Sequence, residues 1–115
     1  MRHGVLYGVG VGPGDPELIT VKAVKTIEKT NIIAFPGESP QESTAYMIAV
    51  QAVPQIEKKS LLELPMPMIR DRDSLSERHI KNAEKIIEKL AAGEDVAFLT
   101  LGDPDIYSTF SYIRQ

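Results

Sequence analysis

The sequence predicts an α/β domain with three layers, in which a mainly parallel sheet carries helices on both faces. Short apolar runs of strand length occur at residues 5–11, 31–35, 61–64 and 96–101, and helical patterns separate them. The run at residues 31–35 is continuously apolar, which is typical of a parallel strand covered on both sides. An alternating order of strands and helices favours right-handed crossovers and a parallel sheet.

A helix is expected after each strand. Residues 43–53 form a helical segment that Pro54 ends, and Asp103 with Pro104 opens a last helix. The first helix is indicated by apolar residues at three-residue spacing: Leu18, Val21, Val24 and Ile27.

The third expected helix has the clearest boundaries. Ser74 and Glu77 have the spacing of a capping box, in which each side chain satisfies a backbone N–H group at the helix start. Gly93 is expected to end this helix. Its predicted apolar stripe contains Ile80, Ala83, Ile87, Leu90 and Ala91.

Composition favours one soluble, cytoplasmic domain. The chain has 115 residues, of which 43% are hydrophobic and 25% charged, and its net charge is −3. A net negative chain has no overall positive field to attract nucleic acid or an anionic membrane. Without cysteine, the chain can form neither disulfides nor zinc-thiolate sites. No signal segment precedes the first strand, and no apolar stretch approaches a membrane span.

Two loops of the same form follow the first and the last strand. Residues 14–18 and 102–106 both read glycine, aspartate, proline, acid, aliphatic. In a parallel sheet both loops lie at the carboxyl edge, where ligands bind in such folds. Asp15 and Asp103 can each cap the following helix, and each glycine lets a ligand approach the backbone. Two such loops are expected to flank one cleft.

The glycines of the first loop do not fit a dinucleotide-binding or a Walker loop. In a G-x-G-x-x-G motif starting at Gly8, the third glycine would fall on Pro13, and in one starting at Gly10 it would fall on Asp15. The second strand ends at residues 35–36 without the acid that holds a ribose. No Gly-Lys-Ser/Thr sequence follows. The alternative that the glycines only shape a tight turn stays open.

The long motif at residues 9–23, V-G-V-G-P-G-D-P-E-L-I-T-V-K-A, resembles the opening signature of the tetrapyrrole methylases, which also include diphthine synthase. Residues 99–104, L-T-L-G-D-P, resemble that family's second signature, and residues 105–110 resemble the precorrin-2 C-20 methylases more than the uroporphyrinogen methylases. The resemblance covers essentially the whole chain. Members of the family have two domains, and this chain resembles only the first of them. Residues 1–115 are therefore expected to be a truncated N-terminal domain, with the second domain absent.

The resemblance implies that S-adenosylmethionine lies in the cleft between a five-stranded domain and the second domain. Gly102 would leave the backbone open to the cofactor, and Asp103 can accept hydrogen bonds from an amino or hydroxyl group. A pure helix cap stays an alternative for Asp103. The cofactor-binding positions carried over are Pro13, Leu101, Gly102, Asp103 and Ile106.

The resemblance also implies a tetrapyrrole substrate with many carboxylate arms, so a net negative protein needs local cations. Arg70 and Arg72, expected in the loop after the third strand, are the best placed, because arginine can grip a carboxylate with two bonds. A solvated loop is the competing interpretation, since acids alternate with these arginines. Asp15 and Tyr107 are the other substrate candidates.

The implied reaction is methyl transfer from S-adenosylmethionine to C-20 of precorrin-2 or cobalt-factor II in cobalamin biosynthesis. Pro36 stands where uroporphyrinogen methylases hold an aspartate, so no catalytic residue is assigned. His3 and His79 are expected at the surface, and no metal site is expected.

The isolated chain is expected to be inactive, and the family's habit predicts a homodimer. The alternatives are another methylase of the family, acting at a different macrocycle position or as diphthine synthase, and a non-catalytic α/β module that binds a nucleotide or a protein.

Overall fold

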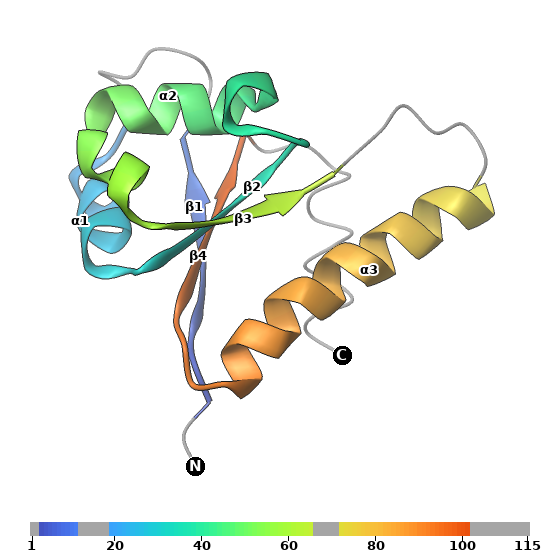
Figure 1. Cartoon of the computed structure of the whole chain (residues 1–115). Helices are drawn as coiled ribbons and strands as arrows, with labels where there is room; N and C mark the ends of the chain where they lie inside the picture. Colours follow the sequence, from blue (N-terminus) through green and yellow to red (C-terminus); the bar gives the residue numbers. More distant parts are fainter. Residues whose placement is uncertain (1–2, 12–18, 66–71, 102–115) are drawn as a thin grey trace.

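The structure, a computed structural model, describes residues 3–11, 19–65 and 72–101. Within these ranges the chain alternates strands with helices, as the apolar runs predicted (Figure 1). The elements in chain order are β1 (Leu6–Gly10), α1 (Val21–Lys29), β2 (Ile32–Pro36), the 3-10 helix η2 (Pro40–Glu42), α2 (Thr44–Ala52), the 3-10 helix η3 (Pro54–Lys58), β3 (Ser60–Leu64), α3 (Arg72–Ala91) and β4 (Val96–Thr100).

The described strands form one sheet in the order β1-β4-β2-β3, and every pairing in it is parallel. The predicted parallel sheet is therefore confirmed. β4 is the last described strand in the chain, yet it lies between β1 and β2. All five residues of β4 are buried, which explains the unbroken apolar run at residues 96–99.

Helices cover both faces of the sheet, which confirms the three predicted layers. α1 and α2 lie on one face and α3 on the other (Figure 1). Successive side chains of a strand point to opposite faces, so Ile33 and Phe35 belong to the core under α1 and α2, while Ile32 and Ala34 belong to the core under α3. Burying one such isoleucine or phenylalanine stabilises the fold by about 1.5 to 3 kcal/mol.

Hydroxyl side chains cap the first two α-helices. The hydroxyl of Thr20 accepts a hydrogen bond from the N–H of Ala23 at 3.1 Å, and Ser43 does the same for Tyr46 at 3.2 Å. The prediction that Asp15 caps the first helix is wrong, because α1 begins only after Thr20. Asp15 itself lies outside the described residues.

Two predictions about α3 are also wrong. The helix begins at Arg72, so Ser74 and Glu77 lie inside it rather than forming its capping box. The apolar stripe is rotated, since Ile80 and Ile87 are 41% and 43% exposed. Gly93, with a φ of 85°, follows the end of the helix as expected.

Polar residues account for the rotation of α3. His79, Asn82, Ala83 and Ile86 are buried, so the prediction that His79 lies at the surface is wrong, whereas His3 is exposed as expected. The amide of Asn82 donates a hydrogen bond to the carbonyl of Pro65 at 3.0 Å, just after β3 ends. A polar side chain with such a partner can be buried, and a count of apolar residues alone does not detect it.

Candidate functional site

The strongest candidate site lies at the carboxyl edge of the sheet, where β1 and β4 end side by side. Gly10 pairs with Thr100, the last residue of β4. The N–H of Val11 donates to the carbonyl of Thr100 at 2.9 Å, so the pairing continues to the point where the first loop begins. The chain therefore enters both signature loops from neighbouring positions on one edge of the sheet, as the parallel arrangement predicted.

Buried side chains hold these two strand ends in place. Val9 and Val11 are 3% and 0% exposed, and Leu99 is completely buried in the same core, under α1 and α2. Thr100 is only 6% exposed. A segment packed this closely moves little, so both loops start from a rigid support.

Gly10 leaves space at this edge. A Cβ atom built on Gly10 would meet no atom within 4 Å. Leu101, which follows β4 directly, has 41% of its surface exposed. A ligand can therefore approach the backbone at Gly10, and Leu101 offers an exposed apolar side chain directly after the paired strand end. From the sequence, Gly10 is one of several glycines of the first loop, and the structure shows that it faces open space.

Of the residues predicted to bind the cofactor, the structure describes Leu101 alone. It follows β4 directly and is exposed, and its role toward a cofactor stays a prediction. The other four, Pro13, Gly102, Asp103 and Ile106, lie outside the described residues.

Most of the predicted substrate residues also fall in parts of the chain that are not described. Asp15, Arg70 and Tyr107 lie outside the described residues. Arg72 is the first residue of α3, so the prediction that it belongs to the loop after the third strand is wrong. The helix begins earlier than the proposed capping box at Ser74 indicated.

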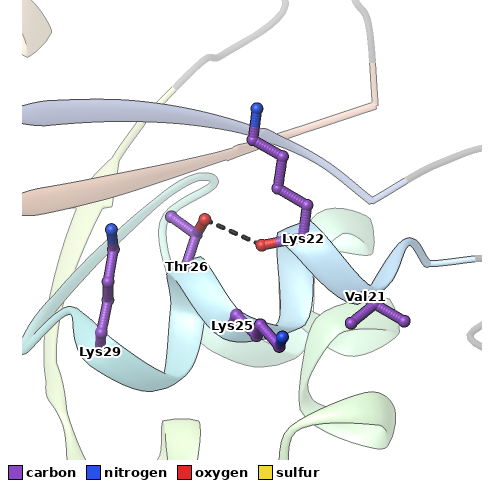
Figure 2. A pocket seen from close by; sticks show the side chains of 5 residues that line it. All are labelled: Val21, Lys22, Lys25, Thr26 and Lys29. Carbon is purple, nitrogen blue, oxygen red and sulfur yellow. Dashed lines mark hydrogen bonds between the residues drawn. The ribbon is translucent and has the colours of Figure 1, made fainter.

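A basic groove lies on one face of α1, and the sequence analysis missed it. The groove has a volume of about 470 Å³ and is lined by Val21, Lys22, Lys25, Thr26 and Lys29 (Figure 2). The ammonium of Lys29 lies 4.5 Å from the centre of the Tyr7 ring on β1, and the hydroxyl of Thr26 donates to the carbonyl of Lys22 at 2.9 Å. The sequence does contain a signal for this groove: the spacing of the lysines places them on one helix face.

Titration and metal binding add no further site in the part of the chain that the structure describes. Burial raises the pKa of the Tyr46 phenol, and the negative charge of Glu57 raises it further, so Tyr46 stays protonated inside the core. Among the described residues, no three histidine, cysteine or acidic side chains are grouped as metal ligands would be. No helix in these ranges combines the length and apolar character of a membrane span.

A family model and several similar proteins all point to one protein family. Residues 5–115 match the family model of the Tetrapyrrole (Corrin/Porphyrin) Methylases. The chain is 38% identical over 109 residues to a probable cobalt-precorrin-2 C(20)-methyltransferase of Methanocaldococcus jannaschii, an alignment that covers 94% of this chain and 45% of that protein. It is 33% identical over 121 residues to a precorrin-2 C(20)-methyltransferase of a Sinorhizobium species, covering 96% and 48%.

A third relative is the cobalamin biosynthesis protein CobIJ of Mycobacterium bovis, which is 34% identical over 121 residues, with 97% of this chain and 23% of that protein covered. The chain thus spans about half, or less, of the length of these relatives. The family match extends over nearly the whole chain, and it includes the paired ends of β1 and β4. This chain belongs to the tetrapyrrole methylase family.

Proposed function

We propose that this chain is the N-terminal half of a methyltransferase that uses S-adenosylmethionine to methylate C-20 of precorrin-2 or of its cobalt-containing counterpart, in cobalamin biosynthesis. The observation that carries the proposal is the pairing of Gly10 with Thr100, from which both signature loops start at one edge. The similarity to two relatives named as C(20)-methyltransferases supports the choice of position.

The residues at the carboxyl edge fit a bound methyl donor. S-adenosylmethionine supplies a methyl group that its sulfonium charge already activates, so the protein needs no nucleophile of its own. The open backbone at Gly10 and the exposed side chain of Leu101 provide room and an apolar contact. Their contribution is alignment of the donor and exclusion of water, effects that are together worth several kcal/mol.

The remaining site assignments complete this proposal. We assign Pro13, Gly102, Asp103 and Ile106 to the cofactor, with Asp103 as a hydrogen-bond acceptor. Asp15, Arg70, Arg72 and Tyr107 are assigned to the substrate. A homodimer and a cytoplasmic location belong to the same proposal, as does a second domain that closes the cleft.

The proposal is tested on the full-length protein. We expect calorimetry to show binding of S-adenosylhomocysteine, and labelled methyl to be transferred from S-adenosylmethionine to precorrin-2. NMR of the product should place the methyl group on C-20. Methylation at another carbon would identify a different methylase of the family, and an absence of cofactor binding would favour a non-catalytic α/β module. Residues 1–115 on their own should transfer no methyl group, because the proposal assigns the other half of the cleft to a second domain.

Substituting Gly10 tests whether the open space belongs to the methyl donor. In the full-length protein, Gly10→Val should raise the Kd for S-adenosylhomocysteine by about tenfold or more, a change of about 1.4 kcal/mol, because the new side chain would fill the ligand's space. The fold should be retained, since a Cβ at this position meets nothing within 4 Å and valine suits a strand.

The matched control is Ser60→Val, which places the same new side chain at an exposed position at the amino end of β3, away from the carboxyl edge. It should leave the Kd unchanged. A folded Gly10→Val protein that binds S-adenosylhomocysteine as tightly as the wild type would show that this space is not the donor's.

A further inference from the structure

The basic groove on α1 concentrates positive charge in a chain whose net charge is −3. Lys22, Lys25 and Lys29 line it, and none of its lining residues in the described part of the chain is acidic. Glu28, the acidic residue of α1, lies outside the lining. In Figure 2 the side chains of Lys22 and Lys29 rise from the same side of the helix, and that of Lys25 lies on the adjoining side.

This arrangement is unfavourable for the helix by itself. Lys25 stands three residues after Lys22 and four before Lys29, and like charges at these spacings repel each other. Lys22 also lies in the first turn of α1, where the helix dipole disfavours a cation, and no acid in that turn compensates. An anionic ligand in the groove would relieve both effects.

The groove is partly preorganised. The stacking of Lys29 on the ring of Tyr7 restricts its side chain and leaves ammonium N–H groups to donate. Lys59 provides a contrast, since its ammonium already donates to the carbonyls of Glu28 and Thr30 at 2.9 and 2.8 Å. The ammonium groups of the groove lysines, unlike that of Lys59, line an open groove in which a ligand can reach them.

The groove begins at the carboxyl end of the sheet. The chain leaves β1 at that end, and α1 leads back to the amino end of β2, which is parallel to β4 and β1. Lys22, in the first turn of α1, therefore lies toward the same end of the sheet as the candidate site. From Lys22 to Lys29 the groove follows seven residues of helix, about 10 Å along its axis. A ligand at the carboxyl edge that carries several anionic arms can therefore place one arm at Lys22 and others further along α1.

We propose that Lys22, Lys25 and Lys29 form a binding site for the peripheral carboxylate groups of the tetrapyrrole substrate. This inference rests on the proposed function, because it takes the ligand of the carboxyl edge to be a polycarboxylate macrocycle. A substrate of this kind needs local cations, and the proposal places those cations on α1. The three ammonium groups hold the carboxylates as point charges, so the site fixes the position of the macrocycle more than the geometry of each arm.

The test measures binding to the full-length protein by quenching of porphyrin fluorescence. The probes are an octacarboxylate porphyrin and its octamethyl ester, which has the same ring without the charges. In the triple variant Lys22→Gln, Lys25→Gln, Lys29→Gln, the Kd for the octacarboxylate should rise by about tenfold or more at low salt, and less at high salt. The corresponding triple substitution to arginine should restore binding, because it keeps the charges.

A matched control removes the same charge elsewhere, with Lys58→Gln, Lys81→Gln and Lys89→Gln, and should leave the Kd nearly unchanged. Equal loss in the control variant, or no loss in the groove variant, would overturn the proposal. So would binding of the ester as tight as that of the octacarboxylate. Calorimetry with S-adenosylhomocysteine separates the two proposals: a wild type that binds no cofactor refutes the proposed function, whereas normal cofactor binding with unchanged porphyrin binding in the groove variant refutes this site alone.

Discussion

Replacing Phe35 with alanine should lower the free energy of unfolding by about 3 to 5 kcal/mol, the usual result of removing a fully buried phenylalanine. Phe35 is 0% exposed and belongs to β2, which has a strand on each side. Its ring packs against that of Tyr46 on α2, with centroids 5.1 Å apart and planes tilted by 52°. The substitution therefore removes both apolar burial and an aromatic pair, and it leaves a cavity between the sheet and α2.

Denaturation of the full-length protein by urea measures this effect. Met47→Ala on α2 is the control, because that side chain is 44% exposed and its removal should change the free energy of unfolding by less than about 0.5 kcal/mol. If Phe35→Ala were as mild as the control, the larger core would not be packed as described.

Gly4→Ala should also strongly destabilise the protein, by about 3 kcal/mol, the upper range for overpacking. A Cβ on Gly4 would lie 1.8 Å from the carbonyl oxygen of Glu94 and 2.4 Å from its carbon. Both are backbone atoms, which a rotamer change cannot move. The N–H of Gly4 donates to the carbonyl of Leu90 at 2.8 Å, and the N–H of Val5 donates to Asp95 at 2.7 Å, so the two segments cannot separate without losing these bonds.

The same substitution at the other end of β1 provides the control. Gly10→Ala places its Cβ in open space and should not destabilise the fold, because glycine is itself unfavourable within a strand. Thermal unfolding of the two full-length variants should therefore differ clearly. Equal melting temperatures would contradict the close approach of Gly4, just before β1, to the backbone of Glu94, just before β4.

The sequence predicted the elements of this fold better than their arrangement. A short apolar run indicated each strand, and continuous apolarity indicated parallel pairing. The strand order was not predictable in this way, because an apolar run does not say which neighbour it will have. The face of α3 was mistaken since the buried Asn82 is polar, and the start of α1 was mistaken since Asp15 and Thr20 are both good capping residues.

The candidate site was predictable to a similar degree. Two loops of the same form after parallel strands implied a common edge, and the pairing of Gly10 with Thr100 places their starting points together. The spacing of Lys22, Lys25 and Lys29 indicates a basic helix face, but the groove beside it and the contact of Lys29 with Tyr7 form only in the folded chain. Contacts between residues distant in sequence leave no periodic pattern for a sequence analysis to detect.

The insertion of β4 between β1 and β2 has a consequence for how the protein is made. During synthesis on the ribosome, the segments of β1, β2 and β3 emerge first, and among the described strands β4 is the one to which β1 bonds. Joining β1 to β4 closes a loop of about 90 residues, and such non-local pairing slows folding and leaves apolar strands exposed in the meantime. We therefore expect the nascent chain to leave β1 without its β4 partner until residue 100 has left the exit tunnel.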